Sequence, residues 1–299
     1  MSLLEEMFRS KIWTPPERSE GQKKRAVDDC DVFLKIISGP RVHARLFSNN
    51  DSVSLKHYKS TNRLILYFHG NAEDIHATKT FMAWLSVNTQ CNVLAVDYVG
   101  YGRSCSTEVP TEQNMHETAE ALLEYATATL GHKMHTVSLM GRSLGSIPAV
   151  YLASKPENAG LQGLVLISGL ASGARCVLPS AYTPRLLQAT VDGVFGANIL
   201  RIPGVQCMIL FVHGDADAVV GLQNSIAMKE KSNRWCQAEV FVVRGGTHDD
   251  LWTKHANGIL ARLNDFLASS FENARLHASD PEARAPYEPD SAFPLDFFD

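Results

Sequence analysis

The stretch Thr136-Val137-Ser138-Leu139-Met140-Gly141-Arg142-Ser143-Leu144-Gly145 decides the fold. Its apolar first half predicts a β-strand, and the residues after Ser143 predict a helix. A G-x-S-x-G sequence between a strand and a helix forms a tight turn that holds the serine in a strained, exposed conformation. Glycines suit this turn because a Cβ would clash where the backbone segments approach. We therefore predict that Ser143 is a nucleophile, and the helix N-terminus favours negative charge beside it.

The composition is that of an ordinary globular protein. The chain has 299 residues, of which 45% are hydrophobic and 20% are charged, so one or two α/β domains can bury a full core. The net charge of −4 gives no reason to expect a nucleic-acid partner. Residues 1–18 carry early acidic residues and no apolar core. We therefore predict neither a signal peptide nor a transmembrane span, and a cytoplasmic protein.

The cysteine pattern indicates a reduced protein. Six cysteines are scattered along the chain without a C-x-x-C pair, and buried apolar positions explain them better than disulfides or metal ligands. No cluster of His, Asp or Glu has metal-ligand spacing. We expect no metal and no cofactor. The six are Cys30, Cys91, Cys105, Cys176, Cys207 and Cys236.

Strand-like and helix-like runs alternate along most of the chain. The eight predicted strands are Asp31–Ser38, Val42–Phe47, Arg63–His69, Asn92–Asp97, His135–Met140, Leu161–Ser168, Gln206–His213 and Glu239–Arg244. The five predicted helices are Asp74–Asn88, Thr111–Leu130, Leu144–Ser154, Gly221–Lys231 and Thr253–Glu272. Gly39-Pro40 favours an antiparallel hairpin between the first two strands. The alternation after them predicts a mostly parallel sheet with flanking helices.

We divide the chain into three parts. Residues 1–30 are an N-terminal extension, and residues 31–272 form the α/β domain. Residues 273–299 are an acidic, Pro-rich tail that we expect to be disordered, because residues 280–299 hold four prolines, six acidic residues and one basic residue. Only residues 170–205 separate the sixth and seventh strands, which predicts little or no cap domain and an open site.

A base and an acid for Ser143 follow later strands. A serine hydroxyl needs a general base and that base needs an orienting carboxylate, in the chain order Ser, Asp, His for this turn. His248 follows the eighth strand after two glycines and is the predicted base, with His255 as its rival. Asp217 follows the seventh strand and is the predicted acid, with Asp215 as the alternative.

Two backbone N–H groups should stabilise an oxyanion. We predict that Leu144 supplies one and that Asn71, in the loop His69-Gly70-Asn71-Ala72-Glu73-Asp74, supplies the other. We expect His69 to form hydrogen bonds within this loop rather than to transfer protons. The loop at residues 97–104 lacks G-x-G-x-x-G spacing and a Walker lysine, so we interpret it as structural.

With these elements in order, the chain resembles α/β-hydrolases, and most of all the α/β-hydrolase domain-containing protein 17 family. The resemblance runs from about Pro15 to Phe271. It includes residues 69–74, Asp97-Tyr98 with Gly100-Tyr101-Gly102, Pro110-Thr111-Glu112 with Asn114, residues 141–145, Ser172-Gly173 with Arg175 and Pro179, and His213-Gly214, Asp217 and His248. It implies an α/β-hydrolase fold and a serine hydrolase that removes palmitoyl groups from proteins.

Two features of the sequence differ from that family. Arg142 stands where relatives usually carry an uncharged polar residue. Family members reach membranes through palmitoylated N-terminal cysteines, whereas no cysteine precedes Cys30 here. The resemblance therefore gives no basis for predicting this mode of anchoring, and we expect transient contact with a membrane surface. The predicted substrate is an acylated protein. The alternative is that the chain is a monoacylglycerol or lysophospholipid lipase, or an esterase that cleaves small esters. The third hypothesis is a non-catalytic binding protein with the same fold.

Overall fold

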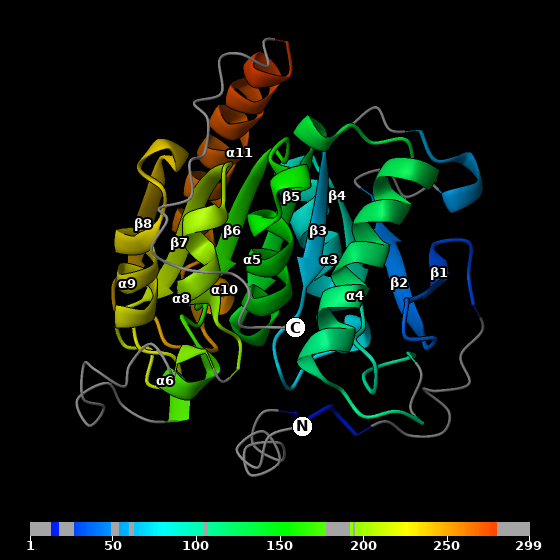
Figure 1. Ribbon diagram of the computed structural model, residues 1–299, viewed down its shortest axis with the longest axis horizontal. Helices are drawn as coiled ribbons and strands as arrows, with labels where there is room; N and C mark the ends of the chain where they lie inside the picture. Colours follow the sequence, from blue (N-terminus) through cyan, green and yellow to red (C-terminus); the bar gives the residue numbers. More distant parts are fainter. Residues whose placement is uncertain are drawn as a thin grey trace.

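An eight-stranded sheet forms the centre of the molecule (Figure 1). The computed structural model describes residues 13–17, 27–48, 54–59, 63–104, 107–177, 192–193 and 195–279. The strand order is β1-β2-β4-β3-β5-β6-β7-β8. β2 pairs antiparallel with β1 and β4, and the other neighbouring strands are parallel. The strands are β1 (Asp31–Lys35), β2 (Arg41–Phe47), β3 (Leu64–Phe68), β4 (Asn92–Val96), β5 (Val137–Arg142), β6 (Gly163–Ile167), β7 (Met208–Gly214) and β8 (Ala238–Val243).

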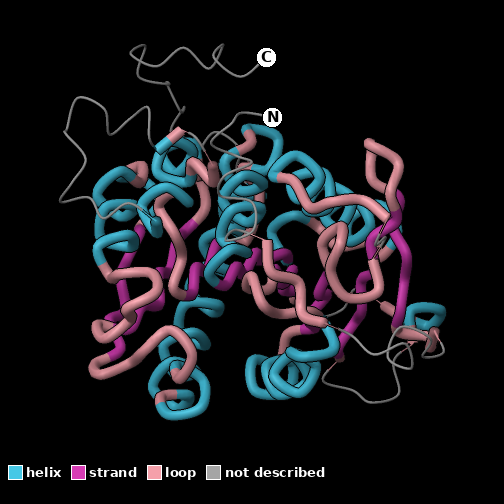
Figure 2. Tube along the Cα trace, turned by 90° about the horizontal axis from the view of Figure 1, so that it is seen from below, coloured by secondary structure: helices cyan, strands magenta, loops and turns pink. Residues whose placement is uncertain are grey.

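Helices cover both faces of this sheet (Figure 2). α3 (Ile75–Thr89), α10 (Leu251–Lys254) and α11 (Ala256–Ser279) pack against one face, and α4 (Glu112–Glu124), α5 (Ser146–Ser154), α8 (Asn198–Arg201) and α9 (Gln223–Lys231) pack against the other. α6 (Gly173–Val177) lies between β6 and β7. All eight predicted strands and the predicted hairpin are present. The structure confirms the predicted fold, a mostly parallel sheet flanked by helices.

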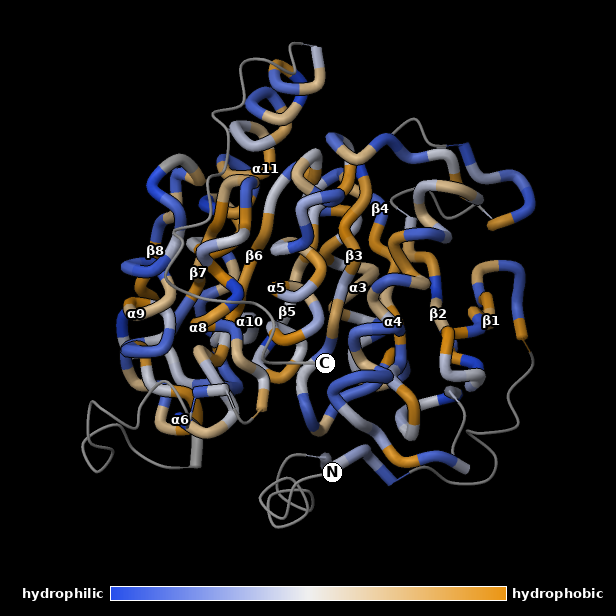
Figure 3. The backbone as a smooth tube through the Cα atoms, viewed as in Figure 1, coloured by the Kyte–Doolittle hydropathy of each residue, from blue (hydrophilic) through white to orange (hydrophobic). Residues whose placement is uncertain are grey.

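The two apolar layers explain why the central strands are hydrophobic throughout. In β3, Leu64, Leu66 and Phe68 face the layer under α4 and α5, while Ile65 and Tyr67 face the layer under α3 and α11. Figure 3 shows these strands as hydrophobic along their length. Each such side chain contributes about 1.5–3 kcal/mol when fully buried. These strands do not alternate between apolar and polar residues, because neither face of the sheet is exposed to water.

The C-terminal helix corrects one predicted boundary. The expected helix Thr253–Glu272 is two helices, α10 and α11, that meet at His255. α11 continues to Ser279, so residues 273–279 are helical rather than part of the tail. Its buried face persists because Ser270 and Ala274 follow Leu267 at helical spacing. Residues 280–299, where we expect the acidic tail, lie outside the described residues.

The described part of the connection between β6 and β7 contains two short α-helices that the sequence did not indicate. α6 has five residues and α8 has four, too few to give a recognisable hydrophobic period. Residues 178–191 of this connection lie outside the described residues. Across the described ranges, no helix combines the length and the apolar character needed to span a bilayer.

The loop after β4 is organised by a buried carboxylate. Asp97 accepts the backbone N–H groups of Ile75, at the start of α3, at 2.7 Å and of Arg103 at 3.1 Å. The ring of His43 lies 3.0 Å from the same side chain. Gly102 has φ 53° and its Cβ would lie 2.0 Å from Asp97 Oδ2. This loop is therefore structural, as predicted.

Asp97→Asn should lower the free energy of unfolding at pH 7 by about 3 kcal/mol, because it leaves the buried His43 without one of its charged partners. Burial alone would raise the pKa of Asp97, but the hydrogen bond from His43 and the nearby His69 hold it below its ordinary value. Urea denaturation at pH 7 measures the loss.

The matched control is Asp29→Asn, since Asp29 pairs on the surface with Lys56 and should change stability by less than about 1 kcal/mol. A carboxyl group with a lowered pKa stabilises the fold above its unfolded pKa of about 3.9. That contribution is lost as the pH falls through the folded value. The Asp97→Asn deficit should therefore shrink in acid, and an equal loss in both variants would contradict this account.

Candidate active site

The turn at Ser143 has the geometry of a nucleophile elbow. β5 leads through Ser143–Gly145 into α5, and Ser143 has φ 49°, a left-handed value that is strained for serine. A Cβ on Gly141 would lie 2.4 Å from the Gly145 carbonyl oxygen, and one on Gly145 would lie 2.1 Å from that of Phe68. Both glycines are therefore required by close backbone contact.

His248 and Asp217 complete a hydrogen-bonded chain with this serine. Ser143 Oγ lies 3.1 Å from His248 Nε2, and His248 Nδ1 lies 2.8 Å from Asp217 Oδ2. The three residues follow β5, β8 and β7, whose carboxyl ends share one edge of the sheet. The structure thus brings together the three residues that the sequence suggested. Ser143 is only 8% exposed, less open than we expected, because the imidazole of His248 lies against its hydroxyl.

The carboxylate of Asp217 is held in its ionised form. Its Oδ1 accepts the backbone N–H groups of Val219 and Val220 at 3.0 and 2.8 Å. Burial alone would raise the pKa of Asp217, but the nearby His213 and the hydrogen bonds from His248 and the Val220 N–H hold it well below its ordinary value. His213 is fully buried, 3.5 Å from Asp217. The sequence did not indicate this role for His213, because its contact with Asp217 depends on the path of the loop after β7.

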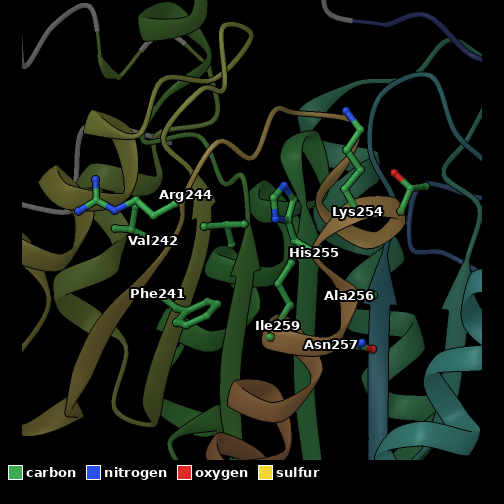
Figure 4. A pocket seen from close by; sticks show the side chains of 11 residues that line it. Phe241, Val242, Arg244, Lys254, His255, Ala256, Asn257 and Ile259 are labelled. Carbon is green, nitrogen blue, oxygen red and sulfur yellow. The ribbon is translucent and has the colours of Figure 1, made fainter.

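The two alternative residues lie elsewhere. Asp215 accepts the Gly245 N–H at 2.7 Å and pairs with Arg244 at 3.3 Å, so it binds the turn after β8 rather than the imidazole. His255 lines a pocket of about 460 Å³ between β8 and the start of α11, together with Phe241 (Figure 4). The geometry therefore favours Asp217 and His248.

The loop after β3 lies against the elbow. Its Asn71 Oδ1 accepts the hydroxyl of Tyr101 at 2.7 Å and the backbone N–H of Thr14 at 3.0 Å. His69 Nδ1 lies 2.8 Å from the Gly70 carbonyl oxygen, which confirms its predicted hydrogen bond within the loop. These contacts fix the loop that carries the predicted oxyanion donor. The roles of the Asn71 and Leu144 N–H groups stay predictions.

A charged pair beside the nucleophile was missed. Arg142 donates to Glu73 in the loop after β3 and to the His248 carbonyl oxygen. The sequence showed Arg142 as an added cation but did not indicate its partner. An unpaired cation next to a buried elbow requires a carboxylate nearby, and this was the signal that could have found Glu73.

Comparison with known proteins places the chain among α/β-hydrolases. A family model described as serine aminopeptidase, S33 matches residues 59–197. The human α/β-hydrolase domain-containing protein 17B is 30% identical over 209 residues, which cover 70% of this chain and 67% of that protein. The Caenorhabditis elegans protein aho-3, also named as an α/β-hydrolase domain-containing protein, is 33% identical over 68% of this chain. The match spans 57% of the length of aho-3.

Solved structures agree on the fold. An esterase from Pyrococcus furiosus superposes with a TM-score of 0.63 at 15% identity, covering 87% of this chain and 97% of its own. Est1E from Butyrivibrio proteoclasticus, solved with ferulic acid, gives 0.61 at 16% identity and covers 81% of this chain and 99% of its own. At such identities the likeness concerns the fold alone.

Proposed function

This chain belongs to the α/β-hydrolase domain-containing protein 17 family, and on that premise we propose that it is a serine hydrolase that cleaves acyl thioesters of proteins. The observation that carries the proposal is the hydrogen-bonded chain from Ser143 through His248 to Asp217. It begins at a strained serine and ends at a buried carboxylate with a lowered pKa. Such an arrangement has the parts that acyl transfer through a serine requires.

In the first half of the reaction, Ser143 Oγ attacks the acyl carbon while its proton passes to His248 Nε2. The negative charge of Asp217 stabilises the imidazolium that forms. The Leu144 and Asn71 N–H groups donate to the oxygen that becomes negative. When the tetrahedral intermediate collapses, the carbon–sulfur bond breaks and His248 returns its proton to the departing thiolate. The products are a free cysteine side chain and an acyl-Ser143 ester.

In the second half, water replaces the thiol. His248 takes a proton from the water as it attacks the acyl-Ser143 carbonyl carbon, and a second oxyanion forms at the same two N–H groups. Collapse breaks the bond to Ser143 Oγ, which recovers the proton from His248. A fatty acid leaves, and the enzyme returns to its starting state without a net change in charge.

The family supports a protein-bound palmitoyl group as the substrate, since the resemblance implies protein depalmitoylation. Among the described residues, the connection between β6 and β7 contributes short helices of five and four residues. We propose that the enzyme acts in the cytoplasm, with transient contact with a membrane surface.

We predict that an S-palmitoyl peptide is hydrolysed with a kcat/KM at least about tenfold higher than a monoacylglycerol or a short p-nitrophenyl ester, a preference of about 1.4 kcal/mol in transition-state binding. The same preparation should be assayed on all three, with an aminoacyl p-nitroanilide as a peptidase control. Faster cleavage of the monoacylglycerol would indicate a lipase, and faster cleavage of the short ester would indicate an esterase. Either result would contradict the proposed substrate class.

A further inference from the structure

Arg142 immediately precedes Ser143, and its guanidinium reaches two neighbouring loops. Nη1 donates to Glu73 Oε1 in the loop after β3. Nη2 donates to the main-chain oxygen of His248 at 3.0 Å and to Asp249 Oδ1 at 3.0 Å. One side chain therefore joins the nucleophile elbow, the loop with the predicted oxyanion donor and the loop with the general base.

Glu73 extends this connection to the backbone of its own loop. Its second oxygen, Oε2, accepts the Gly70 N–H at 2.8 Å. A Cβ on Gly70 would lie 3.0 Å from Glu73 Oε2 and 3.4 Å from Arg142 Nη1, so a glycine leaves room for the pair to close over the loop. Because the Gly70 N–H is engaged by Glu73, the next N–H along the chain, that of Asn71, is the candidate oxyanion donor.

The environment of the pair differs from that of an ordinary surface salt bridge. The side chains of Arg142 and Glu73 are 15% and 23% exposed, whereas Asp249 is 85% exposed. A surface contact such as that with Asp249 is screened by water and contributes little. The fork of a guanidinium fixes direction as well as distance, so the partly buried contacts with Glu73 and His248 define the geometry.

The position of His248 explains why such a connection matters. β6 and β7 lie between β5 and β8 in the sheet, so the base reaches the serine from a strand that is not adjacent to it. The turn before it contains Gly245, with φ 68°. The hydrogen bond from Arg142 holds the main chain at His248 itself. A displacement of about 1 Å between reacting groups can lower the rate about 100-fold.

We propose that Arg142 and Glu73 form a positioning pair that sets the spacing of the oxyanion loop and of His248 around Ser143. This inference rests on the proposed function, since it concerns the same site. Neither side chain exchanges a proton with the substrate. The pair acts through the groups that do, and it therefore affects turnover rather than ground-state binding.

The test compares Arg142→Gln, Glu73→Gln and the double variant, with a short p-nitrophenyl ester as the substrate. Each single variant should lower kcat about 10- to 100-fold and change KM by less than about threefold, because the reacting groups are misplaced while the pocket remains. The loss of kcat in the double variant should not exceed the loss in the less active single variant, because either substitution breaks the same pair. Independent, multiplying losses or an unchanged kcat would overturn the proposal.

Arg262→Gln is the matched control. Arg262 forms a two-pronged pair with Glu239 on α11 and β8, away from the elbow, and this variant should keep the wild-type kcat. Thermal denaturation of every variant checks that the protein is folded. If Arg142→Gln does not fold, Glu73→Gln carries the same test, because it keeps the shape of the side chain and removes only its charge.

The rate at which a fluorophosphonate probe labels Ser143 provides a second readout. It should fall with kcat in both single variants and stay at the wild-type value in Arg262→Gln. Wild-type protein that neither labels nor hydrolyses the ester would refute the proposed function. Active wild-type protein with equally active Arg142 and Glu73 variants would refute the positioning pair alone.

Discussion

Ser143→Ala should abolish labelling by a fluorophosphonate probe and lower kcat at least about 10⁴-fold. The variant lacks the oxygen that attacks the acyl carbon, so the covalent route is closed. Only the catalysis supplied by substrate binding and the oxyanion donors remains, about 10³–10⁴ over the reaction in water. Removing the hydroxyl also frees His248 Nε2, which lies 3.1 Å from it, and does not disturb the backbone.

Ser138→Ala on the same strand is the matched control. Ser138 is buried, and its hydroxyl has no hydrogen-bond partner among the described residues, so its removal should leave labelling and turnover unchanged. Both variants are measured with the S-palmitoyl peptide and with the probe. Retained labelling and turnover in Ser143→Ala would refute this serine as the nucleophile.

The elbow was predictable because its cause is local. A strand, two glycines around a serine and a helix follow one another within about twenty residues. Each glycine is needed because the backbone approaches too closely there for a Cβ. The positions of Asp217 and His248 were predictable for a related reason. They follow the strands whose carboxyl ends must meet the elbow once a parallel sheet forms.

The contacts between loops were not predictable. Glu73 and Arg142 are distant in sequence and meet only because β3 and β5 are neighbours in the sheet. The same holds for His213, whose burial beside Asp217 depends on the path of the loop after β7. Sequence periodicity reports which face of an element is buried. It carries no information about which polar side chains from different loops will pair.

The end of the C-terminal helix illustrates a second limit. The residues after Glu272 are mixed in polarity, and the acidic tail beyond them suggested that the helix had already ended. The structure continues α11 to Ser279 because Ala274 still packs on the buried face and Arg275 pairs with Glu272 one turn earlier. A few interactions of this kind decide where a helix ends, and composition alone cannot resolve them.

Asp217→Asn should lower kcat about 10⁴-fold, whereas Asp215→Asn should change it by less than about threefold. The carboxylate of Asp217 accepts a hydrogen bond from the N–H at His248 Nδ1. This keeps the proton on Nδ1 and leaves Nε2 free to accept the proton of Ser143. An asparagine presents an N–H to the imidazole instead. It favours the tautomer with the proton on Nε2, which cannot act as a base towards the serine.

The comparison of these two variants is informative because they share one loop and one chemical change. Asp215 binds the Gly245 N–H and Arg244, so its replacement alters the turn before His248 without touching the imidazole. Each variant is assayed with the S-palmitoyl peptide at pH 7 after thermal denaturation has shown that it folds. Because the pKa of Asp217 lies well below its ordinary value, its carboxylate stays charged as the pH falls through 5. Loss of activity on acidification then belongs to another group, and a larger effect of Asp215→Asn would exchange the roles of the two acids.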